Sequence, residues 1–135
     1  MSLNSILIVD DSLSVRLLLK NYYAELGITD QTEAGNGVEA LEMLQLRSFD
    51  VISLDIIMPE MDGVECLKEI KELNIPSFIL VCSYLSEEPK MVANLVNFIP
   101  IEQIILKNFD DISQRMRLKN LFSSVSINPK VEKSA

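Results

Sequence analysis

Short apolar runs divide this chain, and helical patterns fill the segments between them. The runs lie at 5–9, 50–54, 77–82 and 102–106, and a weaker one at 30–34 lies between the first two. Strands that alternate with helices predict a parallel sheet with helices on both faces. At 135 residues, the chain is long enough for one α/β domain of this kind and too short for a separate output domain as well.

Capping residues and prolines indicate where the helices begin and end. Ser12 is a suitable N-cap for the first helix, which Gly27 ends. Pro89 suits only a first turn, so the helix that contains it is predicted to be weak. Further helices are expected after Asn36-Gly37, after Asp62-Gly63, over 87–97 and over about 110–123. The apolar positions that support the stronger helices are Val15, Leu18, Leu19, Tyr22 and Leu26, then Val38, Leu41 and Leu44, then Val64, Leu67 and Ile70, and finally Ile112, Met116, Leu118, Leu121 and Phe122.

Carboxylates follow two of the apolar runs. Asp55 comes directly after the run at 50–54, and Asp10 and Asp11 come directly after the run at 5–9. The carboxyl edge of an open parallel sheet is where such folds keep their chemistry. Three carboxylates at one edge would repel each other unless a hard divalent cation lies among them, and Mg²⁺ prefers oxygen ligands of this kind. The sequence therefore predicts a site for phosphate and Mg²⁺.

The charge of the chain is uneven. Residues 1–110 hold 18 acidic and 7 basic side chains, whereas residues 111–135 hold 2 acidic and 5 basic ones. An acidic body argues against direct nucleic-acid binding, because that function needs a basic face to displace counterions from the phosphates. Much of this charge is also what an ordinary solvated surface carries.

Membrane and redox functions find little support in the sequence. No window approaches the roughly 18 continuous apolar residues of a membrane span, and no basic stretch precedes an apolar one near the N-terminus, so a cytoplasmic location is expected. Cys66 and Cys82 lack CxxC spacing and are expected to be reduced core residues. The chain has no histidine, so any phosphoryl group carried on a histidine must come from another protein.

Three segments, in this order, resemble the receiver domain of two-component response regulators. They are Ile6-Leu7-Ile8-Val9-Asp10-Asp11-Ser12, the segment Ala34-Gly35-Asn36-Gly37-Val38-Glu39-Ala40-Leu41, and the segment from Asp55 to Gly63, which reads Asp-x-x-Met-Pro-x-Met-Asp-Gly. The resemblance covers about residues 1–124, tightly to Ser83 and loosely beyond it. It implies a flavodoxin-like, doubly wound sheet of five parallel strands in the order 2-1-3-4-5. Residues 125–135 are polar and without periodicity, and they are expected to form a disordered C-terminal tail.

The resemblance also implies a role for each residue of the site. Asp55 would attack the phosphoryl group of a kinase phosphohistidine and become an aspartyl phosphate. Lys107 and Ser83, at the ends of the fifth and fourth strands, would supply the cation and the hydroxyl that contact the phosphoryl oxygens. The implied holders of Mg²⁺ are Asp11 and Asp55 directly, Asp10 through water, and the backbone carbonyl of Ile57.

Three positions depart from the usual pattern of the family. Ile104 stands where a Tyr or Phe switch is usual, Tyr84 replaces a small residue after Ser83, and Asn108 replaces the proline after Lys107. A non-proline cis bond costs about 3 kcal/mol, so the bond before Asn108 is expected to be trans. Tyr84 could restrict the attacking water and prolong the phosphorylated state, or it could point to solvent. The face formed by the fourth helix and fifth strand is therefore expected to give an atypical output.

This sequence pattern has three alternative functional interpretations. The first is a stand-alone receiver, similar to single-domain chemotaxis regulators, that takes its phosphoryl group from a histidine kinase or a histidine phosphotransfer protein. It would switch conformation to control an unknown downstream protein, and it would catalyse only its own phosphorylation and dephosphorylation. The second is a receiver-like binding module that works without phosphate. The third, a phosphatase of the haloacid dehalogenase type, needs a second Asp two residues after its nucleophile, but Ser12 and Ile57 stand at those positions.

Overall fold

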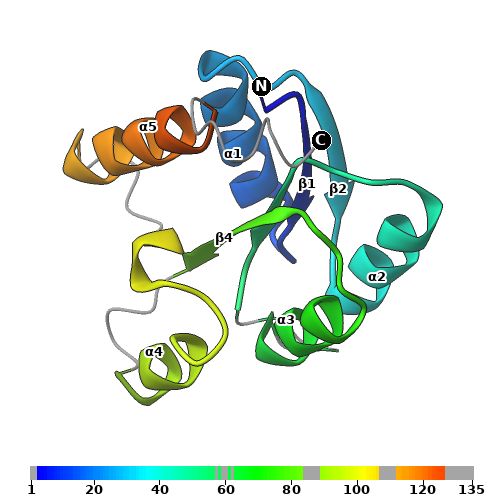
Figure 1. Ribbon diagram of the computed structural model, residues 1–135. Helices are drawn as coiled ribbons and strands as arrows, with labels where there is room; N and C mark the ends of the chain where they lie inside the picture. The colour runs from blue at the N-terminus through cyan, green and yellow to red at the C-terminus, as the bar shows by residue number, and fades with distance from the viewer. Residues whose placement is uncertain are drawn as a thin grey trace.

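The computed structural model describes residues 3–56, 58, 61, 63–83, 89–106 and 112–126, which form a parallel sheet between two layers of helices (Figure 1). The described strands are paired in the order β2-β1-β3-β4-β5. This order confirms the predicted flavodoxin-like, doubly wound α/β fold. The strands are β1 (Ser5–Val9), β2 (Asp30–Ala34), β3 (Val51–Leu54), β4 (Phe78–Ser83) and β5 (Ile104–Leu106).

The helices follow the strands in alternation, as the sequence predicts. Ser12 caps the first helix, because its side chain accepts a hydrogen bond from the amide of Val15. Pro89 is the first residue of its helix, the position at which its missing N–H costs nothing. The last helix continues to Ser126, beyond the predicted end at about 123. The helices are α1 (Leu13–Glu25), α2 (Gly37–Leu46), α3 (Gly63–Glu72), α4 (Pro89–Leu95) and α5 (Ile112–Ser126), with a 3-10 turn, η2 (Ile101–Gln103), before β5.

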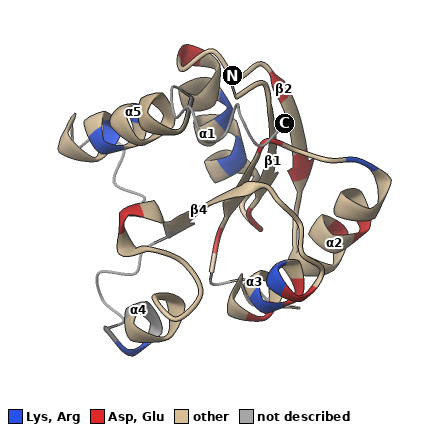
Figure 2. Ribbon diagram, viewed as in Figure 1, with Lys and Arg blue, Asp and Glu red and all other residues tan. Residues whose placement is uncertain are grey.

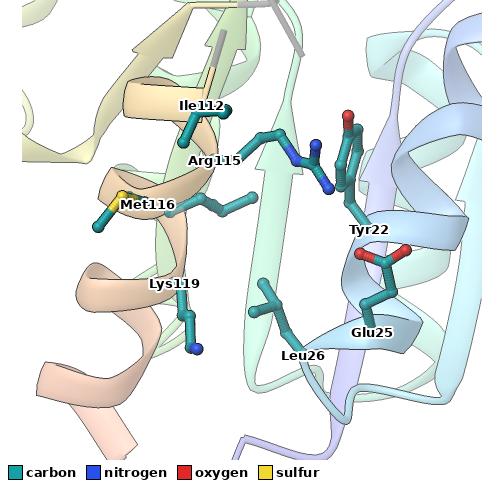
Figure 3. A pocket seen from close by; sticks show the side chains of 8 residues that line it. Tyr22, Glu25, Leu26, Ile112, Arg115, Met116 and Lys119 are labelled. Carbon is teal, nitrogen blue, oxygen red and sulfur yellow. The ribbon is translucent and has the colours of Figure 1, made fainter. Parts of the chain in front are cut away.

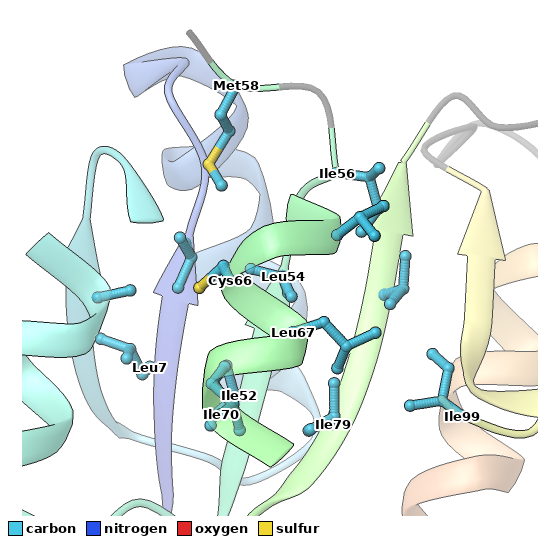
Figure 4. Close-up of a cluster of buried hydrophobic side chains, with 14 of the residues drawn as sticks. Leu7, Ile52, Leu54, Ile56, Met58, Cys66, Leu67, Ile70, Ile79 and Ile99 are labelled. Carbon is cyan, nitrogen blue, oxygen red and sulfur yellow. The ribbon is translucent and has the colours of Figure 1, made fainter. Parts of the chain in front are cut away.

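Two apolar cores lie on the two faces of the sheet, because successive strand residues point to opposite faces. Leu7, Ile52 and Ile79 face α2, α3 and α4 (Figure 4). Ile8 and Leu80 face α1 and α5. The central strands are buried on both faces and therefore consist of continuous apolar runs. β1 and β3 are two of these central strands, and their pairing places their carboxyl ends side by side.

Some apolar positions that support the helices in the sequence are exposed in the structure. Ile112 and Met116 of α5 are 67% and 56% exposed, although they were expected to pack. Helical spacing shows which residues share a stripe but not how far the helix is rotated about its axis, and α5 packs through Leu118 and Phe122 instead. Leu18 and Val38 are exposed for the same reason.

In α1 the rotation is set by a buried polar contact. Tyr23 is fully buried, and its hydroxyl lies 2.6 Å from Ser53 Oγ of β3, so the two hydroxyls satisfy each other. Burial is the main reason why the pKa of Tyr23 is raised well above its usual value, so the phenol stays protonated. The ring also packs against Phe122 of α5 at a centroid distance of 5.8 Å.

Candidate functional site: an acidic cluster at the carboxyl edge of the sheet

Asp10 and Asp55 lie next to each other because each follows the last residue of a paired strand. Val9 of β1 and Leu54 of β3 are register partners. The Asp55 amide donates to the Val9 carbonyl at 2.9 Å, and the Asp10 amide donates to the Ala34 carbonyl of β2 at 3.1 Å. These bonds continue the ladders by one residue and hold both aspartates in the frame of the sheet.

The three predicted aspartates form one cluster. Carboxylate oxygens of Asp10, Asp11 and Asp55 all lie within 4.8 Å of one another. Asp10 is 1% exposed and Asp55 4% exposed, whereas Asp11 is open to solvent. Three ionised carboxylates at this spacing, two of them out of water, favour a hard cation among them, and the all-oxygen donor set with one solvent-facing member fits hydrated Mg²⁺.

The turn between β1 and α1 holds this acidic pair from several sides. The Ser12 amide donates to Asp10 Oδ1 at 2.9 Å, and the Ser12 side chain caps α1. Arg16, one turn into α1, donates from Nη1 to the Asp10 carbonyl oxygen at 2.6 Å. The position of the exposed Asp11 is therefore set by fixed residues on both of its sides.

A pair of cations on α1 holds Glu33 of β2. Arg16 Nε lies 2.9 Å from Glu33 Oε1, and Lys20 Nζ lies 3.1 Å from Oε2. Partial burial acts to raise the pKa of Glu33, but the hydrogen bonds from Arg16 and Lys20 outweigh it and hold the pKa below its usual value. Neither Arg16 nor Glu33 was predicted from the sequence as part of the site. The feature that could have pointed to Arg16 is its position, a basic residue five positions after the acidic pair.

The loop after β3 is closely packed around Gly63. The Gly63 amide donates to the Ile56 carbonyl at 2.7 Å. A Cβ atom on Gly63 would overlap the Asp55 carbonyl oxygen and the Ile56 Cα, both of which are backbone atoms. Ile56 and Met58 of this loop are buried in the core below it (Figure 4). The backbone that carries Asp55 is thus held against the first turn of α3.

The other predicted positions lie at the same end of the sheet or outside the described residues. Ser83 ends β4, two residues after Val81, the register partner of Leu54. Ile104 begins β5, is 7% exposed and belongs to the core on the α3 side. The positions outside the described residues are Ile57, Tyr84, Lys107 and Asn108.

Neither cysteine belongs to the site. Cys66 and Cys82 are not joined in a disulfide and lie buried in opposite cores, as expected for core residues. Burial and then the neighbouring charge of Glu69 raise the pKa of Cys66 to about 12, which keeps it in the unreactive thiol form.

A groove of about 330 Å³ separates α1 and α5, away from the acidic cluster (Figure 3). Tyr22 and Leu26 form its α1 wall, and Arg115 of α5 lies over the Tyr22 ring at 5.1 Å from the ring centroid. The described basic residues of α5 are Arg115, Arg117 and Lys119, and this helix carries no acidic residue (Figure 2). The exposed Ile112 and Met116 border the same groove.

Comparison with known proteins points to one family. The sequence model of the response regulator receiver domain matches residues 6–119. The chain is 38% identical to the chemotaxis protein CheY of Bacillus subtilis (strain 168) over 87 residues, which are 64% of this chain and 72% of that protein.

Solved structures agree with this match. The Thermotoga maritima response regulator TrrA in complex with Mg²⁺ and beryllofluoride aligns with a TM-score of 0.69 at 28% identity, covering 86% of this chain and 98% of that one. CheY of Borrelia burgdorferi, solved with CheX, beryllofluoride and Mg²⁺, gives a TM-score of 0.74 at 28% identity, covering 88% and 89%. Within the described ranges, no helix has the length and apolar content that a bilayer span requires.

Proposed function

Because this chain belongs to the response regulator receiver family, we propose that it accepts a phosphoryl group on Asp55 in a Mg²⁺-dependent reaction and thereby changes its affinity for a partner protein. The observation that supports this most is the cluster itself. Oxygens of Asp10, Asp11 and Asp55 lie within 4.8 Å of one another, and Asp55 is held in place by its backbone bond to Val9. TrrA and the Borrelia CheY, both similar to this chain, were solved with Mg²⁺ and beryllofluoride.

In the proposed reaction, a carboxylate oxygen of Asp55 attacks the phosphorus atom and forms a P–O bond. The bond from phosphorus to the histidine nitrogen of the donor breaks, and its electron pair stays with that nitrogen. Asp11, Asp55 and the Ile57 carbonyl would hold Mg²⁺ directly and Asp10 through water, and the bound ion would supply charge neutralisation for the phosphoryl oxygens. Lys107 and Ser83 are proposed to contact the same oxygens. Water later attacks phosphorus, the P–O bond to Asp55 breaks with its electron pair staying on the carboxylate, and inorganic phosphate leaves.

The donor is proposed to be a histidine kinase or a histidine phosphotransfer protein, because the chain has no histidine of its own. A cytoplasmic location fits such a donor. We further propose that the receiver extends to the end of α5 at Ser126, two residues beyond the expected 124, and that a tail follows it. An acidic body whose described basic residues are spread over α1, α3, α4 and α5 favours a protein partner over nucleic acid (Figure 2).

The direct test is mass measurement after incubation with acetyl phosphate or phosphoramidate. We expect one phosphoryl group per chain when Mg²⁺ is present and none when it is chelated. Absence of labelling with both donors at saturating Mg²⁺ would remove the proposed reaction.

Loss of Mg²⁺ affinity is expected to differ between the two members of the acidic pair. A direct carboxylate ligand contributes more than one that acts through water, so Asp11→Ala should weaken Mg²⁺ binding roughly 100-fold and Asp10→Ala about tenfold. Asp10 already accepts a hydrogen bond from the Ser12 amide, whereas Asp11 faces solvent. Amide chemical-shift titrations with Mg²⁺ would give both dissociation constants. Wild-type affinity in Asp11→Ala would make the ligand assignment wrong.

A phosphate-independent binding module is the second candidate. The α1–α5 groove is lined by none of the three clustered aspartates, and Ile104 is buried as an aliphatic core residue. A buried aliphatic residue offers no ring or hydroxyl to relay a movement of Ser83. If this candidate holds, the partner surface does not respond to the acidic cluster.

Beryllofluoride, which mimics the phosphoryl group, separates the two candidates. For a switching receiver, we expect hydrogen-exchange changes over 84–100 and 111–122 and little change around Ile104, because the usual aromatic switch is missing there. No change outside the acidic cluster would support the binding module. Changes centred on Ile104 and its strand neighbours, with the other two segments silent, would instead restore the ordinary output of the family.

A further inference from the structure

We propose that Arg16 is a positioning residue for the metal ligands: it ties the Asp10-Asp11 turn to Glu33 of the neighbouring strand and so keeps both carboxylates in register with Asp55. The inference rests on the Mg²⁺ site of the proposed function. It assigns a role to an arginine and a glutamate that lie outside the acidic cluster.

One end of the Arg16 fork holds the Asp10 carbonyl. β1 ends at Val9, so this carbonyl lies just past the last paired residue of the strand. Arg16 Nη1 donates to it at 2.6 Å. The Arg16 amide also donates to the Ser12 carbonyl at 3.0 Å and closes the first turn of α1. Backbone and side chain of one residue therefore hold the turn that carries Asp11.

The other end of the Arg16 fork is anchored on Glu33. While Nη1 contacts Asp10, Arg16 Nε lies 2.9 Å from Glu33 Oε1. Glu33 pairs with Ile8 in the ladder between β2 and β1, so its backbone is fixed by the sheet. Lys20 holds the second Glu33 oxygen at 3.1 Å. The guanidinium thus connects the turn that carries Asp11 to a residue that cannot shift without moving a strand.

Only an arginine can make this connection. Its planar fork presents Nε and Nη1 in fixed directions, so that one head group reaches a carboxylate and a carbonyl together, whereas lysine has a single nitrogen. The side chains of Arg16 and Glu33 are 17% and 31% exposed. A comparable pair, Arg47 with Asp30, lies at the opposite end of β2 at 2.9 Å but is 43% and 53% exposed. That pair provides a matched control.

Charge and position predict opposite effects on Mg²⁺ binding. Arg16 carries a positive charge beside the Asp10 carbonyl, so if charge alone mattered, its removal would tighten the binding of a cation. If Arg16 positions the ligands, its removal should weaken binding, although the site becomes more negative. Arg16→Lys separates the two effects further, since it keeps the charge and loses the fork.

The experiment measures Mg²⁺ dissociation constants by amide chemical-shift titration for Arg16→Gln, Arg16→Lys and Glu33→Gln, together with the midpoint of urea unfolding. We expect all three variants to bind Mg²⁺ about tenfold more weakly, the lower end of the effect of groups that orient metal ligands. The controls Arg47→Gln and Asp30→Asn should bind within about twofold of wild type, since an exposed pair far from the site contributes little.

Two outcomes would overturn the inference. One is tighter binding in Arg16→Gln with wild-type affinity in Arg16→Lys, which would leave Arg16 a purely electrostatic role. The other is equal weakening in the Arg47 control, which would indicate a general loss of stability. If Arg16→Gln does not fold, the Mg²⁺ dissociation constants of Arg16→Lys and Glu33→Gln still test the positioning role. Failure of the wild-type protein to bind Mg²⁺ would instead count against the proposed function.

Discussion

Asp55→Asn is expected to abolish labelling by acetyl phosphate in the presence of Mg²⁺. The asparagine amide keeps the size and the hydrogen-bonding oxygen of the side chain but lacks the charged nucleophile, so the fold should persist while the acceptor is lost. Intact-mass measurement would show the unmodified chain, while the wild-type protein gains one phosphoryl group. Hydroxylamine should remove the group from wild type, because it cleaves acyl phosphates and leaves phosphoserine and phosphothreonine intact.

Asp50→Asn is the matched control for this variant. Asp50 lies just before β3, whereas Asp55 lies just after it, and Asp50 Oδ2 accepts hydrogen bonds from the amides of Asn4 and Ser5. It is a structural carboxylate of the same type at the opposite end of the same strand, and its loss should leave labelling intact. Labelling of Asp55→Asn to the wild-type level would identify a different acceptor and make the assignment of Asp55 wrong.

Gly63→Ala is expected to lower the free energy of unfolding by about 3 kcal/mol, at the upper end of the usual effect of overpacking. The added methyl group would overlap the backbone of Asp55 and Ile56, and a strand end cannot move aside as a side chain can. Urea unfolding would measure the change. Because the displaced backbone carries Asp55, the variant should also be labelled more slowly by acetyl phosphate under conditions in which it is folded.

Gly37→Ala provides the comparison for this prediction. Gly37 and Gly63 are both the first residue of a helix, but the three atoms nearest to a Cβ on Gly37 all belong to the Met61 side chain, at 3.0 Å. Met61 has rotatable bonds and can adjust, so we expect a change below about 1 kcal/mol. Equal losses in both variants would mean that the contact with the Asp55 loop is not what makes Gly63 necessary.

Much of the fold could be predicted because it depends on local patterns. Double burial makes the central strands continuous apolar runs, and the predicted strand at 5–9 matches β1 residue for residue. The meeting of Asp10, Asp11 and Asp55 follows from the carboxyl ends of parallel strands sharing one edge.

The rest depends on contacts between distant segments. The helical spacing of α1 predicts that Tyr22 packs, but Tyr23 is the fully buried ring, and its partner is the hydroxyl of Ser53, thirty residues away. The same is true of Arg16, whose partner Glu33 lies on β2. The sequence pattern predicts that Ile112 and Met116 pack against the core, but both side chains are exposed on α5.

The polar strand β2 has a consequence for how the protein behaves at high concentration. β2 ends the sheet and offers one row of backbone N–H and C=O groups to any extended chain that approaches it. Four of its five residues are the polar Asp30, Gln31, Thr32 and Glu33. Lys20 of α1 and Arg47, just after α2, contact Glu33 and Asp30. A strand that pairs with β2 would have to displace water from these charged side chains, so this edge resists the addition of a second sheet and protects the native protein against β-aggregation.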